Sequence, residues 1–141
     1  MFENVLLPVD LSHPESWEKA LPAAERLMDE DGTLHVLGIA PDFGSSMVAS
    51  YFPPDYEARM LGELHDHLTA FVAERIDSRL KSAVHVGHGH IAETILKMAG
   101  DIGASAIVMS SHPPDDLKTL LIGSNADKVV RHARIPVLVV R

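Results

Sequence analysis

Apolar and polar residues form two different patterns, and these patterns alternate along the whole chain. Short, nearly continuous apolar runs are typical of strands covered on both faces. These runs lie at residues 4–10, 33–40, 81–86, 106–109 and 136–140. The segments between them place apolar residues three and four positions apart, which predicts amphipathic helices. The predicted helices lie at residues 12–31, 56–77, 91–102 and 126–132.

Residues with known positional preferences mark some of the boundaries. Ser12, Pro14 and Glu15 predict the start of the first helix, because serine and a glutamate three positions later can bind free amides of a first turn. The Asp-Gly pair at residues 31–32 predicts its end. Residues 41–54 have no clear period and contain several proline, glycine and serine residues. They predict a long loop that either packs, forms an interface or covers a ligand.

The alternation of strands and helices predicts an α/β fold with an open parallel sheet. Right-handed crossovers place helices on both faces of such a sheet. Ligands then bind outside the carboxyl ends of the strands, which here carry Asp10 and residues 39–40, 87–89 and 109–111. No linker or internal repeat divides the chain, so we expect one domain over residues 1–141.

The strongest candidate for a working site is the stretch of residues 109–125. It follows an apolar strand and ends in Gly123, Ser124 and Asn125, just before the last predicted helix. The first amides of a helix lack partners and the helix dipole favours negative charge, so this end predicts an anion seat. Ser124 and Asp127 also match a plain helix cap, and both interpretations remain open.

Composition excludes several classes of function. The formal net charge of −8 disfavours nucleic-acid binding, which depends on phosphate contacts. The absence of cysteine excludes disulfides and thiol catalysis and fits a reducing interior, so we expect a cytoplasmic protein. No apolar run is long enough for a membrane span, and no basic leader opens the chain.

Nine histidines suggest a metal site, but their spacing does not support one. His85, His88 and His90 span a strand and the following turn, whereas zinc requires three or four converging ligands. His65 and His67 are two apart on a predicted helix and point about 200° apart. Neither a nucleophile elbow nor a Walker motif is present. We therefore predict no metal site, no catalytic residue and no dedicated enzyme.

The order of elements, the Leu-Pro-Val-Asp start at residues 7–10 and the C-terminal segment resemble the universal stress protein family. The specific part is residues 121–140, which read LIGSNADKVVRHARIPVLVV. The resemblance covers essentially the whole chain. It implies a five-stranded parallel sheet of order 3-2-1-4-5 with helices on both faces, a Rossmann-like fold of the adenine nucleotide alpha hydrolase type.

Many members of that family bind ATP through Gly-x-x-Gly, nine residues, then Gly-Ser, Gly-Thr or Gly-Asn. Gly123 and Ser124 match the last pair, and the nine residues 114–122 precede them. Ser110 and Pro113 replace the first two glycines, and a proline has no amide to donate. The resemblance still implies ATP, accompanied by Mg²⁺ where a triphosphate is bound. The implied nucleotide-binding residues are Pro8, Val9, Asp10, Ile39, Gly89, Met109, Ser110, Ser111, His112, Gly123, Ser124 and Asn125.

The resemblance also implies a homodimer through the final strand, residues 136–140, with a tetramer as a larger assembly. Pairing would protect an apolar strand edge from uncontrolled association. The expected function is a nucleotide-responsive regulatory dimer in the stress response, acting on a partner protein that the sequence does not identify. Two alternatives stay open: a structural or regulatory dimer that binds no nucleotide, and a slow ATPase.

Overall fold

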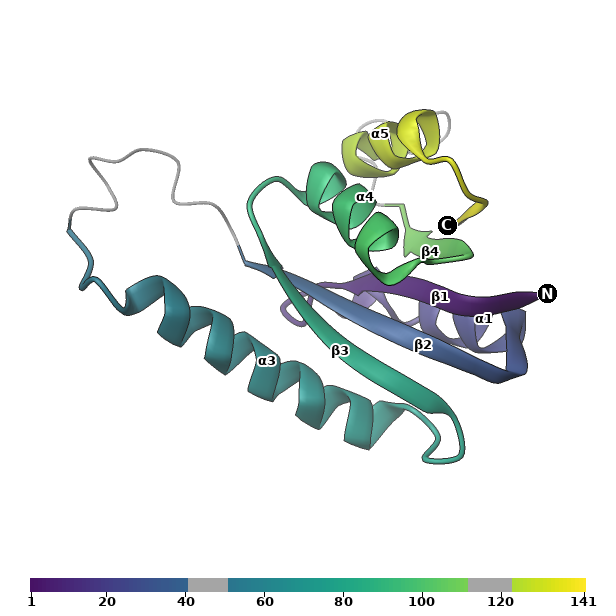
Figure 1. Cartoon of the computed structure of the whole chain (residues 1–141), viewed down its shortest axis with the longest axis horizontal. Coiled ribbons are helices and arrows are strands. Elements are labelled where there is room, and N and C mark those ends of the chain that lie inside the picture. Colours follow the sequence, from purple (N-terminus) through teal and green to yellow (C-terminus); the bar gives the residue numbers. More distant parts are fainter. Residues whose placement is uncertain (41–50, 112–122) are drawn as a thin grey trace.

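The computed structural model, which describes residues 1–40, 51–111 and 123–141, has a central sheet between two layers of helices (Figure 1). Figure 1 shows α1 and α3 on one face of the sheet and α4 and α5 on the other. In chain order the elements are β1 (Phe2–Val9), the 3-10 helix η1 (Pro14–Ser16), α1 (Ala20–Leu27), β2 (Met28–Ala40), α3 (Tyr56–Arg75), β3 (Lys81–His88), α4 (Ile91–Ile102), β4 (Ala106–Ser110), α5 (Ser124–His132) and β5 (Val137–Val140).

The sheet confirms the expected topology. Its strand order is β3-β2-β1-β4-β5, and every paired strand is parallel. The chain winds outward from β1 to β3, then returns past β1 to form β4 and β5. The order therefore reverses between β1 and β4, which is the switch point where open α/β sheets bind ligands.

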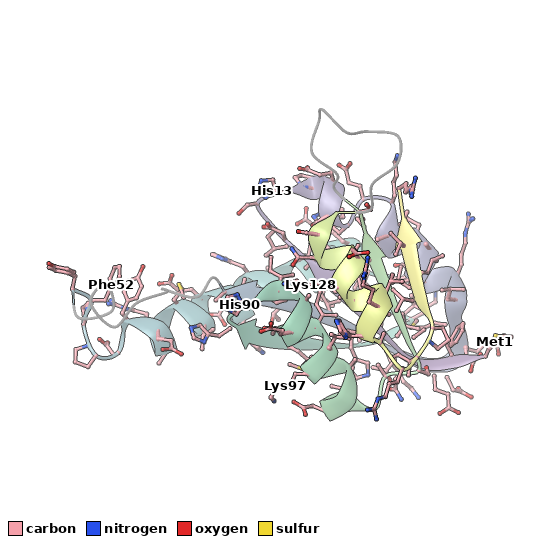
Figure 2. All side chains as sticks on the ribbon, turned by 90° about the horizontal axis from the view of Figure 1, so that it is seen from above. Met1, His13, Phe52, His90, Lys97 and Lys128 are labelled. Carbon is pink, nitrogen blue, oxygen red and sulfur yellow. The ribbon has the colours of Figure 1, made fainter. Side chains whose placement is uncertain are left out.

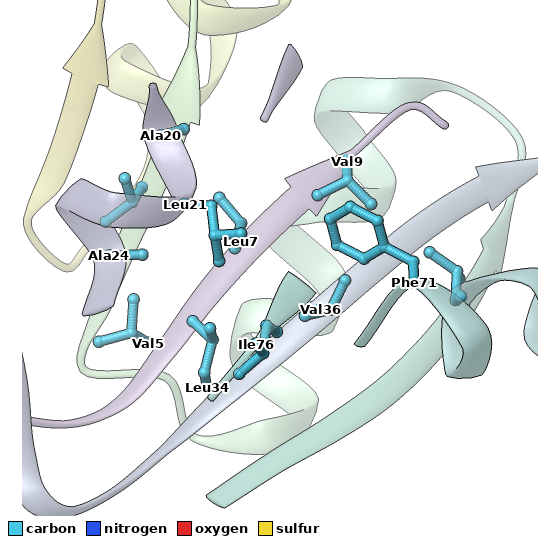
Figure 3. Packing of buried hydrophobic residues seen from close by; sticks show 12 residues of the cluster. Val5, Leu7, Val9, Ala20, Leu21, Ala24, Leu34, Val36, Phe71 and Ile76 are labelled. Atoms are coloured by element: carbon cyan, nitrogen blue, oxygen red, sulfur yellow. The ribbon is translucent and has the colours of Figure 1, made fainter. Parts of the chain in front are cut away.

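Two apolar clusters hold the layers together, one on each face of the sheet. Val5 and Leu7 of β1 pack with α1 and α3, as Figure 3 shows, whereas Leu6 packs with α4 and α5. All three side chains are fully buried. Complete burial of an aliphatic side chain contributes about 1.5–3 kcal/mol, so β1 is a major part of the core.

The first predicted helix begins later than expected, at Ala20 of α1. The proposed cap at Ser12 is wrong, because His13 is the N-cap of η1 and no described side chain caps it. The Ser12 amide instead donates to Asp10 Oδ1 at 3.0 Å. The Ser16 hydroxyl accepts from the Asp10 amide at 2.8 Å and donates to the Asp10 carbonyl at 3.0 Å. These bonds favour a turn followed by the short helix η1 over a continuous α-helix.

The end of that helix, expected at residues 31–32, lies at Leu27, and the strand expected from residue 33 already begins at Met28. The β1–β2 register shifts between Phe2 and Asn4, where β2 carries additional residues. Gly32 sits inside this irregular part. A Cβ on Gly32 would lie 3.0 Å from the Glu3 carbonyl oxygen, so this glycine permits close backbone approach and does not end a helix.

Helix α4 ends at the predicted position. Gly103 adopts the left-handed conformation, with φ 65°, and its amide bonds back to the carbonyls of Ala99 and Gly100. Helix α3 ends two residues before the expected boundary, because Ile76 is extended and buried against the sheet. The final strand begins at Val137, one residue after Pro136.

The N-terminal end of helix α3 lies away from the body of the molecule, and α3 carries the chain back toward the start of β3 (Figure 1). Figure 2 shows Phe52 at one end of the protein and Met1 at the other. The Phe52 ring stacks on Tyr56 with centroids 4.4 Å apart. Residues 41–50 of the predicted loop lie outside the described residues, so its role stays a prediction. Among the helices that the structure describes, none has the length and apolar character needed to cross a membrane.

The close approach of α3 to β2 makes Gly38 a test of the packing. A Cβ at Gly38 would lie 2.6 Å from Leu68 Cδ1, and Leu68 is fully buried, so the core around it must shift to admit a methyl group. We expect Gly38→Ala to lower the free energy of unfolding by about 1–3 kcal/mol, measured by urea denaturation. The matched control is Gly62→Ala, where a Cβ meets nothing within 4 Å. Equal stability of the two variants would contradict this account of the packing.

Candidate functional site

A cavity of about 180 Å³ lies at the carboxyl ends of the strands, at the switch point. Seven of the residues expected from the sequence line it: Pro8, Val9, Asp10, Ile39, Met109, Ser110 and Asn125. They come from β1 and the residue after it, from β2 and β4, and from the first turn of α5. The parallel sheet therefore gathers residues that are more than 100 positions apart in the chain.

Three further lining residues were not anticipated, namely Ser16, Ile91 and Ile95. Ile91 and Ile95 belong to the apolar stripe of α4, which by itself indicates only a core-facing helix. Yet Ile91 remains 46% exposed, because it stands at the first position of α4 beside the cavity. The sequence signal for this cavity-lining role was the position of Ile91: it is an apolar residue at the start of a helix, just after a turn at the carboxyl end of a strand.

A second cavity of about 480 Å³ adjoins the first and extends toward α3. The two share Val9, Asp10, Ile39 and Ile91. Gly89 lines this second cavity, with φ 117°, a conformation that favours glycine. Gly89, one of the expected nucleotide-binding residues, therefore lines the larger of these two cavities.

Asp10 is held in place by its local turn. Its carboxylate accepts a hydrogen bond from the Ser12 amide and lies 3.0 Å from His13 Nδ1. Its backbone amide and carbonyl both contact the Ser16 hydroxyl. Asp10 thus projects from a rigid corner at the rim of both cavities, although its side chain remains largely exposed.

The two serines at the end of β4 have different environments. Ser111 is 9% exposed, and its hydroxyl accepts a hydrogen bond from the Gly123 amide at 3.1 Å. The Ser111 amide donates to the Val140 carbonyl at 2.9 Å. Ser111 therefore ties the start of α5 to the end of β5. In contrast, the buried Ser110 hydroxyl has no hydrogen-bond partner among the described residues.

The start of α5 differs from the predicted cap. Gly123 is the N-cap and Ser124 is already the first helical residue, so the expected Ser124–Asp127 capping pair is wrong. Asp127 instead pairs with Arg131 one turn later, at 3.0 Å. No described side chain caps α5. First-turn amides have no intrahelical acceptor, and within residues 1–40, 51–111 and 123–141 nothing accepts from those of Ser124 and Asn125, which suits them to an anion.

The remaining expected residues divide into two groups. Ser111, Gly123 and Ser124 form the junction between β4 and α5, outside the lining of the first cavity. His112 lies outside the described residues. Binding of a nucleotide by any of these residues stays a prediction.

The histidines considered for a metal site form a different arrangement. His85 Nε2 lies 2.8 Å from Nδ1 of His35 on the neighbouring strand, and His35 Nε2 lies 3.0 Å from Asn4 Oδ1. An amide oxygen only accepts, so His35 carries its proton on Nε2 and accepts from His85 through Nδ1. His88 instead faces Glu57 at 3.7 Å. No three His, Asp or Glu side chains in the described parts of the chain converge as metal ligands.

Burial lowers the pKa of both His35 and His85 below the usual 6.5. For His35, the neighbouring His85 lowers the pKa further, because two imidazolium charges would repel each other. The sequence did not reveal this pair, since the two residues are 50 positions apart and meet only through the β2–β3 register.

A family model for the universal stress protein family matches residues 1–141. The chain belongs to the universal stress protein family. Universal stress protein G of Escherichia coli O157:H7 is 36% identical over 146 residues, covering all of both chains. The solved structure of the protein MJ0577 has a TM-score of 0.79 and 26% identity, and the match covers 99% of this chain and 96% of that one. Another universal stress protein, solved in complex with cAMP, has a TM-score of 0.60 and 18% identity, with 99% and 97% coverage.

The His35–His85 pair predicts how the stability of this universal stress protein depends on pH. The folded state disfavours protonated imidazole at both positions, whereas the unfolded chain protonates near pH 6.5. The unfolded state therefore binds more protons in acid, and the free energy of unfolding should fall as the pH drops below about 6.5.

Urea denaturation from about pH 7.5 to about pH 5.5 measures this slope. The double variant His35→Gln, His85→Gln should show a shallower slope, because glutamine does not titrate. The control is the double variant His65→Gln, His67→Gln, in which two exposed histidines of α3 are replaced. The account fails if both double variants keep the slope of the original protein.

Proposed function

We propose that this universal stress protein binds ATP or another adenine nucleotide at the carboxyl edge of its sheet. The observation that supports this most strongly is the cavity where β1, β2 and β4 meet the first turn of α5. Much of its lining is apolar, and Asn125 brings the first turn of α5, which no described side chain caps, to the same cavity. A nucleotide has the matching division between an apolar base and an anionic phosphate chain.

The apolar wall suits a planar base. Ile39, Ile91 and Met109 lie around the cavity and offer aliphatic and thioether surface. Asp10 stands at its rim with a fixed carboxylate, a strong acceptor for hydroxyl or amino groups. Binding sites for small molecules usually combine such apolar walls with a few well-placed polar groups.

The phosphates would lie at the start of α5. The helix dipole and the amides of the first turn favour negative charge there. The Ser111 hydroxyl orients Gly123 and so fixes the approach of the chain to these amides. For Mg²⁺, the cavity lining contributes one carboxylate, that of Asp10, so a metal ion would be bound mainly through the phosphates.

Comparisons within the family are consistent with this proposal. A universal stress protein with the same fold is described in complex with cAMP, which is itself an adenine nucleotide. Ser110 and Pro113 of this chain replace glycines of the usual ATP loop, and Ser110 lines the cavity directly. The non-nucleotide dimer is the competing interpretation, and direct binding measurements separate the two.

We further propose a homodimer formed through β5. Among the described strands, β5 pairs with β4 alone, and Leu138 is 41% exposed. Ser111 links β5 to the start of α5, since its amide contacts Val140 and its hydroxyl contacts Gly123. A nucleotide that binds at α5 and prefers one arrangement of this junction would therefore shift the dimerisation equilibrium at β5.

The proposed setting is the cytoplasmic stress response, with an unidentified protein partner.

Titration of ATP by calorimetry tests the phosphate seat. We expect Gly123→Val to weaken binding at least ~10-fold, because its side chain would stand beside the first-turn amides and remove a charge-assisted hydrogen bond. Gly123 has φ −51° and ψ 152°, outside the left-handed region that favours glycine. Gly62→Val on the exposed side of α3 is the control. Undiminished affinity in Gly123→Val would remove the phosphate seat from the proposal.

Light scattering after size exclusion tests the dimer edge. Leu138→Lys should halve the molar mass, because a lysine ammonium cannot be buried without a partner at a paired edge. Val130→Lys is a matched control, since Val130 on α5 is 44% exposed and lies off the sheet. A monomeric original protein, or a Leu138→Lys variant of unchanged mass, would rule out the β5 dimer.

A further inference from the structure

The Ser110 hydroxyl is a buried polar group without a partner in the described structure, on a residue that lines the candidate nucleotide cavity. Buried hydroxyls nearly always have a hydrogen-bond partner, and an unpaired one reduces stability. Such groups persist where a ligand supplies the missing partner, which makes Ser110 different from its neighbour Ser111. The Ser111 hydroxyl is already occupied by the Gly123 amide.

The position of Ser110 indicates which part of a ligand it would meet. It ends β4, between Asp10 after β1 and Asn125 in the first turn of α5. A base placed against Ile39 of β2 and phosphates placed at α5 would span the cavity in that direction. Ser110 then faces the junction between the sugar and the first phosphate.

We propose that Ser110 is a specificity-determining residue whose hydroxyl donates a hydrogen bond to the phosphate nearest the sugar of an adenine nucleotide. The serine hydroxyl has three staggered positions about the Cα–Cβ bond, so the backbone of β4 does not by itself fix its direction. An anionic phosphate oxygen is a better acceptor than a neutral sugar hydroxyl, so the phosphate gains most from this donor. Where the family pattern has a glycine, this chain supplies a side-chain donor. The inference rests on the proposed nucleotide function.

The test compares ligands that differ only in their phosphates. Calorimetry with adenosine, AMP and ATP is performed on the original protein, Ser110→Ala, Ser110→Thr and the exposed-site control Ser82→Ala. Loss of one charge-assisted bond should weaken AMP and ATP about 10- to 100-fold in Ser110→Ala. Adenosine should bind this variant as it binds the original protein, and Ser110→Thr, which keeps the hydroxyl, should recover AMP and ATP binding.

Thermal unfolding without ligand provides a second readout with the opposite sign. Ser110→Ala removes an unpaired buried hydroxyl, so the ligand-free variant should melt at a higher temperature than the original protein. A purely structural role would lower the melting temperature and affect all three ligands alike. Ser82→Ala should change neither readout.

The outcomes separate this inference from the proposed function. If the original protein binds AMP and ATP and Ser110→Ala binds them equally well, the Ser110 assignment is wrong while nucleotide binding stands. If Ser110→Ala lowers the affinity for adenosine as much as that for AMP, the hydroxyl does not bind the phosphate, and the assignment is again wrong. If the original protein binds none of the three, both proposals fall together.

Discussion

Strand β1 is paired on both edges, with β2 and β4, and packed on both faces by helices. Val5, Leu6 and Leu7 are fully buried as a result. The backbone amides and carbonyls of β1 form their hydrogen bonds with β2 and β4. The strand therefore leaves the core only at its two ends. The first polar side chain that it presents to solvent at its carboxyl end is Asp10. Both cavities of the candidate site meet at that residue.

The site is consequently a product of the sheet and not of any one loop. Parallel strands bring their carboxyl ends to one edge, and the reversal between β1 and β4 leaves a hollow that no crossover helix fills. The turn that follows β1 makes Asp10 rigid through Ser12 and Ser16. Rigid elements of this kind hold binding groups more accurately than mobile loops do.

The tandem serines after Met109 illustrate how neighbouring residues of one type acquire different roles. Ser111 joins three elements, because its backbone reaches β5 and its hydroxyl reaches the residue before α5. It provides a short physical connection between the open sheet edge and the proposed phosphate seat. Ser110 has no such bond, and its unsatisfied hydroxyl is the kind of local cost that proteins retain at functional positions.

The sequence by itself determined the architecture and much of the site. Uninterrupted apolar runs and helical stripes depend only on local burial periodicity, so they predicted the strands, α3, α4 and the edge where Asp10, Ile39 and Met109 meet. The boundary between α1 and β2 was missed, because the approach of Gly32 to the Glu3 backbone overrides the local helix signal.

Only the tertiary structure decided the polar pairings. Ser124 resembled a cap, yet Gly123 occupies that place because the Ser111 hydroxyl holds its amide from twelve positions away. His85 resembled part of a local histidine cluster, yet strand register pairs it with His35. Hydrogen bonds require donor–acceptor distances of about 2.7–3.2 Å, and between side chains from distant segments such distances are set by packing and not by sequence spacing.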